Sequence, residues 1–292
     1  MPMHINAAPN DKGDNMNLMT KPPVRVLAVT SGKGGVGKTN ISVNLAAAFA
    51  RQDKQVLLMD ADLGLANIDI LLGLQPQFDL RHVISGEKTL EEIIVEGPLG
   101  VKVIPASSGI AHMAELSSAE HAGLVRAFSD LSLAADIMIV DTAAGIADGV
   151  ITFCKACQEV LVTVCDEPAS ITDAYALIKL LSKDHGAKRV QIIANMVRSD
   201  AHGEDLYNKI RRVTDRFLDV QVDYLGAVPL DEYVRKAVQQ QKPVISSYPR
   251  SPASVAITKI ANKIDRWRIP EGMSGNLEFF VERLLPKETP TH

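Results

Sequence analysis

The sequence predicts an α/β fold: a doubly wound, mostly parallel sheet with helices on both faces. Short apolar or β-branched runs recur along the chain, and segments with helical periodicity lie between many of them. Several of the runs are apolar throughout instead of alternating, as expected for parallel strands that are covered on both faces. Glycine-rich and acidic stretches directly follow the runs, where such sheets bind ligands.

In chain order, residues 1–23 combine Asn, Asp, Gly and Pro without apolar periodicity, which predicts a flexible arm. One domain is predicted over 24–268, followed by a tail over 269–292. The predicted strands are 24–30, 55–60, 101–106, 136–141, 159–165, 190–196 and 224–229. The clearest predicted helices are 39–52, 119–134, 170–184 and 204–219.

Composition narrows the class of protein. The chain has 292 residues, 46% of them hydrophobic and 23% charged, which is ordinary for a globular protein. A net charge of −4 gives no general attraction to nucleic acid, and three cysteines do not indicate a disulfide framework. No apolar run has the roughly 18 residues of a membrane span, and the first residues show no signal-peptide core. We therefore expect a cytoplasmic location.

The first predicted strand leads into "TSGKGGVGKTN" at 30–40, which fits the phosphate-loop pattern G-x-x-x-x-G-K-[ST] through Gly32, Gly37, Lys38 and Thr39. Glycines in such a loop let backbone N–H groups surround phosphate oxygens, and the following helix adds its positive dipole end. Lys38 is placed to hold the β- and γ-phosphates, and the hydroxyl of Thr39 to coordinate Mg²⁺. The loop therefore predicts a nucleoside triphosphate site.

Acidic residues follow two further strands. Asp141 ends "DIMIVD", as a carboxylate that holds the Mg²⁺ shell would, and Gly145 in "DTAAGIAD" can bring a backbone N–H to the γ-phosphate. Asp60 and Asp62 follow the second strand. A single carboxylate at such a place is usually a helix cap or turn former, but two of them beside a phosphate loop favour a role in the site.

These motifs are similar to those of a known protein family. "KGGVGKT", "DADLGLANID" and "IVDTAAGI" resemble the deviant Walker-A ATPases of the MinD/ParA group. Within that group, "DADLGLANIDILLGL", "CDEPASITDAYALIKLL", "VTDRFLDV" and "LEFFVERLL" resemble the FlhG/FleN regulators of flagellar number in polar-flagellated bacteria. The resemblance covers roughly residues 24–285.

The resemblance implies an ATP- and Mg²⁺-dependent homodimer with slow, regulatory hydrolysis. It gives Lys33 a role in trans, on the phosphates of the partner subunit, while Lys38 acts in cis. It assigns the attacking water to Asp62 and the magnesium shell to Thr39, Asp60 and Asp141. The nucleotide-binding residues that we expect are Gly32, Lys33, Gly34, Gly35, Val36, Gly37, Lys38, Thr39, Asn40, Gly145, Glu167, Asn195, Pro229 and Asp231.

Some of these assignments have plainer alternatives. In the family, the position of Asn195 reads the adenine edge, and Pro229 and Asp231 flank the base, although a strand-end turn would also explain all three. Glu167 and Asp173 resemble a segment near the dimer interface, and helix capping explains that pair almost as well. Many relatives have proline where this chain has Ala143 or Ala144, so the geometry of the γ-phosphate loop is open.

The resemblance also suggests partners. They are a σ54-type transcription activator and the signal-recognition-type GTPase FlhF, although the N-terminal arm lacks a clear copy of the motif that stimulates FlhF. A ParA-like DNA-partitioning ATPase is the alternative, since basic residues gather at Lys209, Arg211, Arg212, Arg216, Arg235 and Lys236. An iron–sulfur carrier is a third class because Cys154 and Cys157 form C-x-x-C, but small buried helix residues explain them better.

The tail contains a predicted amphipathic helix over about 275–285. Its apolar stripe has helical spacing and consists of Leu277, Phe280, Val281, Leu284 and Leu285. Docking on the protein's own surface is one interpretation of this stripe. Weak contact with the inner membrane or the cell pole is the other, which the balanced charges of the helix favour less.

Overall fold

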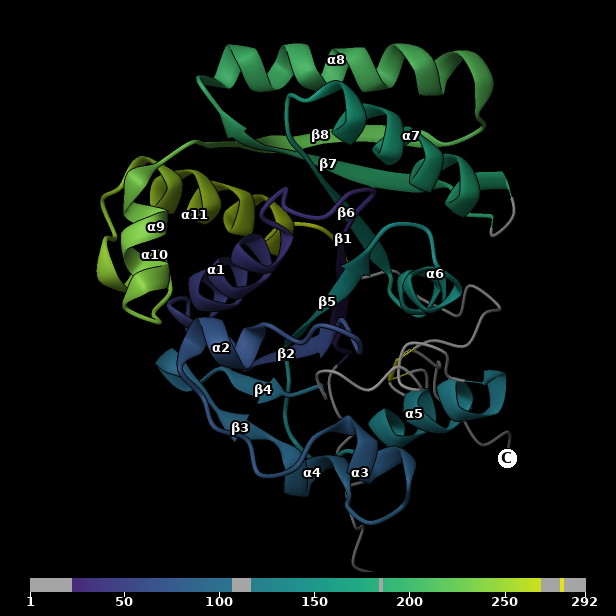
Figure 1. Ribbon diagram of the computed structural model, residues 1–292, viewed down its shortest axis with the longest axis vertical. Coiled ribbons are helices and arrows are strands. Elements are labelled where there is room, and N and C mark those ends of the chain that lie inside the picture. Colours follow the sequence, from purple (N-terminus) through teal and green to yellow (C-terminus); the bar gives the residue numbers. More distant parts are fainter. Residues whose placement is uncertain (1–22, 107–116, 184–185, 269–278, 281–292) are drawn as a thin grey trace, which may run out of the picture.

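The described residues form one eight-stranded sheet with the strand order β3-β4-β2-β5-β1-β6-β7-β8 (Figure 1). The computed structural model describes residues 23–106, 117–183, 186–268 and 279–280. Its strands are β1 (Arg25–Ser31), β2 (Val56–Ala61), β3 (Val95–Glu96), β4 (Lys102–Ile104), β5 (Ile137–Ala144), β6 (Glu159–Val164), β7 (Arg189–Val197) and β8 (Gln221–Pro229). Every neighbouring pair is parallel except β3 and β4. The predicted fold class is confirmed.

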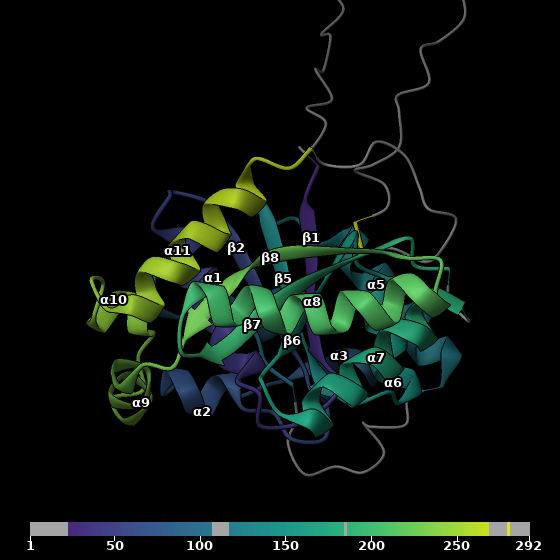
Figure 2. The same ribbon diagram turned by 90° about the horizontal axis from the view of Figure 1, so that it is seen from above.

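Helices cover both faces of this sheet. They are α1 (Lys38–Ala50), α2 (Ile68–Leu72), α3 (Leu80–Ile84), α4 (Leu90–Ile93), α5 (Ser118–Asp130), α6 (Asp148–Lys155), α7 (Pro168–Lys183), α8 (Asp200–Phe217), α9 (Glu232–Gln239), α10 (Val244–Ser247) and α11 (Pro252–Asp265). Figure 1 shows α1, α9, α10 and α11 on one side of the sheet and α5, α6 and α7 on the other. The view from above in Figure 2 keeps the two groups on opposite sides.

Strand β1 shows how the sequence produces this double layer. Val26 and Ala28 point into one hydrophobic cluster, and Leu27 and Val29 into the cluster on the opposite face. Successive side chains of a strand alternate between faces, so a strand with two buried faces carries apolar residues at consecutive positions instead of at every second one. This is why the run "VRVLAVT" lacks alternation.

The predicted elements differ from the observed ones mainly at the short and late elements. Helices α1, α5, α7 and α8 overlap the four clearest predicted ranges, whereas α9, α10 and α11 were not among them. Strand β3 was missed because two residues carry no periodicity, and it is the one antiparallel strand among the described residues. Within the described segments, no helix is long and apolar enough to cross a bilayer.

Two phenylalanines of the tail belong to the hydrophobic core. Phe279 and Phe280 are 0% and 1% exposed, and their rings lie 4.8 Å and 5.8 Å from the ring of Phe128 on α5. The amide of Phe279 donates to the carbonyl of Ala156 at 3.1 Å. Phe280 is therefore docked on the protein's own domain.

The amphipathic helix predicted over 275–285 lies mostly outside the described residues. At 279–280 the backbone forms a turn, and Phe280 has φ of 56°, outside the right-handed helical region. The structure thus places Phe280 in a turn, and the predicted helix over the rest of 275–285 stays a prediction. Its apolar spacing marked a residue that is buried, but burial here comes from a turn that inserts two adjacent aromatic rings.

Replacing Phe280 by Asp is expected to lower stability strongly. The change removes a buried ring and places a carboxylate in an apolar site, so a loss of at least about 3 kcal/mol is expected. That corresponds to a fall in Tm of about 6–12 °C for a domain of this size, measured by differential scanning calorimetry. Phe217→Asp is the matched control because Phe217 is 54% exposed, and its Tm should change little. Equal shifts in both variants would contradict the docking of Phe280.

Candidate functional site

The glycine-rich loop connects β1 to α1, and its conformation requires glycine. Gly35 and Gly37 have φ of 81° and 84°, in the left-handed region that side chains disfavour. A Cβ on Gly37 would also lie 2.5 Å from the side-chain nitrogen of Asn195, and one on Gly32 would clash with the backbone of Asp173. The loop is therefore held tightly between β7 and α7, with Gly34 and Gly35 exposed.

A cavity of ≈ 760 Å³, called the phosphate-side cavity below, opens beside this loop at the carboxyl ends of β1, β2 and β5. Its lining brings together the loop, the first acidic segment and the segment after β5. The lining residues used below are Gly34, Gly35, Gly37, Lys38, Thr39, Asn40, Asp62, Ala143 and Ala144. Most of the predicted phosphate-binding loop thus faces a single cavity, as parallel strands ending at one sheet edge require.

Lys38 and Asp141 form a buried ion pair at the floor of the site. The Lys38 ammonium lies 3.1 Å from a carboxylate oxygen of Asp141, and the two side chains are 8% and 1% exposed. The hydroxyl of Ser42 donates to the same oxygen at 2.7 Å. Ser42 was not among the predicted site residues, although its position four residues after Lys38 puts both side chains on one face of α1. Lys38 and Asp141 are thus held in place by each other and by Ser42.

Asp60 is more deeply constrained than the sequence suggested. It lies beside Asp141 on the neighbouring strand, and its oxygens accept N–H bonds from Asp62, Asn67 and Ile68. Burial, and then the charge of Asp141, raise its pKa to about 7. Asp60 therefore also shapes the loop that carries Asp62 and the start of α2.

Asp62 has a different environment. It lines the phosphate-side cavity, and one of its carboxylate oxygens accepts the N–H of Leu65 at 3.1 Å in a turn. A carboxylate in this setting can accept a hydrogen bond from a water molecule in the cavity. The two neighbouring carboxylates thus differ: Asp60 holds the backbone of the following loop, and Asp62 faces the cavity.

A second cavity of ≈ 400 Å³ lies on the other side of Gly37 and Asn40, which line both cavities. Asn195, Met196, Pro229, Leu230 and Val238 contribute to its mostly apolar wall. An apolar cavity joined to a phosphate-binding loop fits the base of a nucleotide, so this one is called the base-side cavity below. Met196, Leu230 and Val238 were not predicted from the sequence because apolar residues at strand and helix ends carry no motif.

Two predicted base-site residues also have structural partners. The amide nitrogen of Asn195 donates to the carbonyl of Val36 at 2.8 Å, which fixes the loop, and the same residue lines this cavity. Asp231 caps α9 by accepting the N–H of Tyr233, and its other oxygen accepts the N–H of Ala253. The turn interpretation therefore accounts for both oxygens of Asp231, although Asp231 and Pro229 both line the cavity.

Lys33 lies at the outer rim of the loop and pairs within its own chain. Its ammonium is 2.8 Å from a carboxylate oxygen of Glu167, with side chains 38% and 58% exposed. The hydrogen bond and charge of Glu167 raise the pKa of Lys33 above its ordinary value. Helix capping does not explain Asp173, because this residue lies inside α7 and its backbone packs against Gly32. The structure thus joins three of the predicted interface residues, Lys33, Glu167 and Asp173, around the loop.

The segment after β5 is ordered in this structure despite lacking proline. Strand β5 continues to Ala144, which pairs with Ser31 of β1, and the N–H of Gly145 donates to the carbonyl of Ser31 at 2.9 Å. The predicted donor to a γ-phosphate is therefore already bonded. Gly145 can serve a ligand only if this bond to Ser31 opens.

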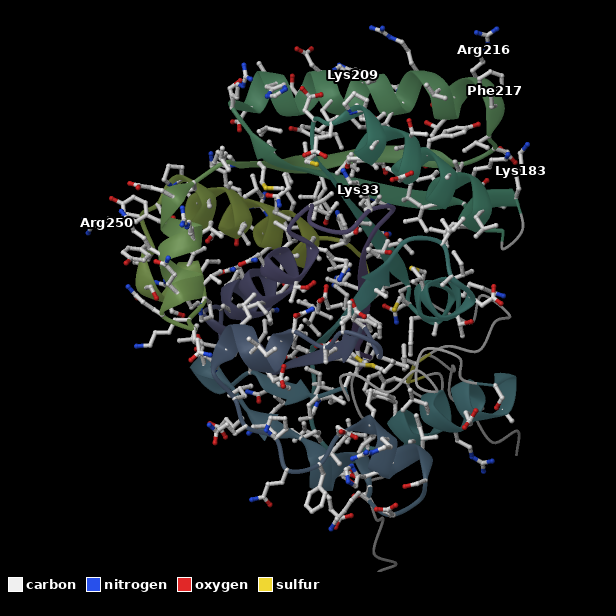
Figure 3. The ribbon with its side chains drawn as sticks, in the orientation of Figure 1. Lys33, Lys183, Lys209, Arg216, Phe217 and Arg250 are labelled. Carbon is white, nitrogen blue, oxygen red and sulfur yellow. The ribbon has the colours of Figure 1, made fainter. Side chains whose placement is uncertain are left out.

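The basic residues and the cysteines have local roles. On α8, Lys209 pairs with Asp166 and Arg211 with Asp215, while Arg216 stacks on the exposed Phe217 and points away from the domain (Figure 3). Cys154, Cys157 and Cys165 are buried, as expected for core residues. Burial raises the pKa of Cys154 to about 12, which keeps it a neutral thiol.

Comparison with known proteins gives a consistent set of relatives. The family model ParA, described as NUBPL iron-transfer P-loop NTPase, matches residues 23–265. The antiactivator FleN of Pseudomonas aeruginosa is 56% identical over 90% of this chain and 94% of its own. The flagellum site-determining protein YlxH of Helicobacter pylori is 33% identical over 94% of this chain and 95% of its own.

Solved structures show the same fold. The septum site-determining protein MinD of Pyrococcus horikoshii, complexed with Mg-ADP, has a TM-score of 0.69 and 23% identity, covering 84% of this chain and 97% of its own. The MinC:MinD complex of Aquifex aeolicus has a TM-score of 0.68 and 27% identity, covering 86% of this chain and 100% of the matched chain.

Proposed function

Because this chain belongs to the MinD/ParA family of P-loop ATPases and has FleN among its relatives, we propose that it is an ATP-driven dimerisation switch that regulates flagellar number. The observation that carries the proposal is the arrangement of two lysines on one loop. Lys38 is buried against Asp141 inside the site, and Lys33 is exposed at the rim beside Glu167. Of these two lysines, Lys33 is the exposed one, and it can reach another molecule when it leaves Glu167.

The residues present fit ATP and Mg²⁺. Loop backbone N–H groups line the phosphate-side cavity with Lys38 and Thr39, and an apolar cavity adjoins it for the base. When bound, Mg²⁺ would supply positive charge that offsets the negative charge of the phosphates. Thr39, Asp60 and Asp141 would hold it, with Asp141 already positioned by Ser42. Asp62 would orient the attacking water from its place in the cavity wall.

The switch itself depends on Lys33. In an ATP dimer, the Lys33 ammonium leaves Glu167 and binds the phosphates of the partner subunit, so ATP becomes part of the subunit contact. A cation supplied in trans stabilises charge that develops during phosphoryl transfer, which makes hydrolysis depend on dimerisation. Slow turnover then limits the lifetime of the dimer, in keeping with a regulatory ATPase.

The flagellar role rests on the relatives. The antiactivator FleN and the flagellum site-determining protein YlxH both match this chain over nearly its whole length. The proposed target is a σ54-type flagellar transcription activator that the dimer restrains, with the GTPase FlhF as a further partner. The proposed location is the cytoplasm, with peripheral contact at the inner membrane or cell pole.

An iron-transfer role, which the name of the family model also suggests, receives less support. Cys154 and Cys157 are buried on or beside α6, and the described residues contain no group of three or more His, Cys, Asp or Glu side chains that could hold a metal ion. A DNA-partitioning role is also less supported, because Lys209 and Arg211 are paired with Asp166 and Asp215.

The proposed function is tested by flagellar number in the source organism. Deleting the gene should change the number of flagella per cell, counted by electron microscopy. Returning the unchanged gene should restore it, whereas returning a Lys33→Ala gene at equal protein level should not. Cells that keep normal flagellation after deletion would overturn the flagellar assignment, irrespective of the ATPase chemistry.

A further inference from the structure

Two adjacent residues between β6 and α7 have partners on different elements of the protein. Glu167 pairs with Lys33 of the phosphate loop at 2.8 Å. Asp166 bonds α8 instead, with one oxygen 2.7 Å from the Nε2 of His202 and the other 2.8 Å from the ammonium of Lys209. Figure 3 shows Lys209 on α8 above Lys33 in that view. The short segment of Asp166 and Glu167 therefore links α8 to the rim of the phosphate loop.

The backbone leaves this link little slack. The N–H of Glu167 donates to the carbonyl of Cys165 at 2.8 Å, which closes a three-residue turn with Asp166 at its centre. Anchoring the Asp166 side chain on α8 consequently fixes the direction in which Glu167 leaves the turn. The two contacts also lower the pKa of Asp166 and keep it ionised.

His202 has a defined tautomer in this arrangement. Its Nδ1 accepts the N–H of Arg198 at 3.2 Å, so its Nε2 carries the proton that is donated to Asp166. Arg198 directly follows β7, whose end carries Asn195 and Met196 of the base-side cavity. The anchor of the turn is thus built on the same strand end that lines the base-side cavity.

We propose that Asp166 is a positioning residue for Lys33: by binding His202 and Lys209, it fixes the turn from which Glu167 holds Lys33 in the free subunit. The ion pair of Lys33 and Glu167 is exposed, and exposed pairs are weak unless their partners are held in place. Asp166 supplies that constraint from α8. The clamp formed by Asp166, His202 and Lys209 sets how readily Lys33 is released, and its effect on dimerisation rests on the proposed role of Lys33 in trans.

The test measures the Lys33 amine directly, in the full-length chain without nucleotide. Trace acetylation with acetic anhydride at pH 8, followed by peptide mass spectrometry, reports the reactivity of each lysine amine. Lys54 is the internal reference because it pairs with the remote Asp265. Glu167→Gln should raise Lys33 reactivity about two- to fivefold, and Asp166→Asn should raise it in the same range.

Two further variants distinguish a positioning role of Asp166 from a general loosening of the fold. Asp166→Asn should add nothing to Lys33 reactivity in a Glu167→Gln background, because Asp166 acts only through Glu167. Asp215→Asn is the matched control, since it breaks another carboxylate contact on α8, the ion pair with Arg211, without touching the clamp. It should leave Lys33 unchanged. Equal Tm values for the three variants would exclude unfolding as the cause.

Unchanged Lys33 reactivity in Asp166→Asn, or an equal rise in Asp215→Asn, would overturn the inference. Because the assay contains no nucleotide, its outcome does not depend on dimerisation. The dimerisation of Lys33→Ala decides the proposed function separately, so the failure of one can be distinguished from the failure of the other.

Discussion

Lys33→Ala is expected to abolish the ATP-dependent dimer while the chain still folds and binds ATP. Lys33 is exposed at the loop rim, so its loss removes little from the folded subunit. Lys38, Thr39 and the loop N–H groups remain to hold ATP in cis. In the dimer, however, two sets of phosphates would approach each other without their bridging cations, and dimer affinity should fall at least about 100-fold.

The measurement is size-exclusion chromatography with light scattering in ATP and Mg²⁺. Asp62→Ala and the Lys33→Ala/Asp62→Ala double variant are compared, so that turnover cannot change the nucleotide state during the run. We expect a dimer for the first and a monomer for the second, both with bound nucleotide. Lys54→Ala in the same background is the control for removing a surface lysine. Two dimers of equal affinity would show that Lys33 has no role in the interface.

Lys38→Ala is expected to abolish ATP binding, whereas Asp62→Ala should preserve binding and suppress hydrolysis. Lys38 is the buried cation of the phosphate-side cavity. Without its charge-assisted hydrogen bonds to the phosphates, the affinity for ATP should fall about 100-fold or more. Asp62 lines the cavity without contacting Lys38, so ATP affinity should change little. If Asp62 orients the attacking water, turnover should fall about 10²- to 10⁴-fold.

Isothermal titration calorimetry with ATP and Mg²⁺ gives the affinities, and single-turnover phosphate release gives the rates. Lys38→Ala also leaves the buried Asp141 without its cation, which can cost about 3–5 kcal/mol of stability. Its fold must therefore be verified by Tm and circular dichroism before weak binding is attributed to the site. Normal turnover by Asp62→Ala would remove the role assigned to that carboxylate.

The sequence predicted the fold class because strand and helix patterns arise from local periodicity. Strands β1, β2, β5, β6 and β7 have long apolar runs that survive in the structure, whereas β3 is too short to carry a pattern. The phosphate loop was equally visible, since Gly35 and Gly37 occupy left-handed positions that few residues other than glycine tolerate. Side chains without a motif, such as Ser42 and Met196, could not be assigned from sequence because their roles depend on what packs against them.

By itself the sequence determined the parallel sheet, the glycine-rich loop, and the placing of Asp60, Asp62 and Asp141 within or just after strands, because each follows from neighbours close in the chain. Only the tertiary structure decided that Lys33 meets Glu167, which lies 134 residues away, and that Phe280 is buried in a turn instead of a helix. Contacts of that kind depend on how distant segments pack, and the periodicity of side chains does not show which distant residue each of them contacts.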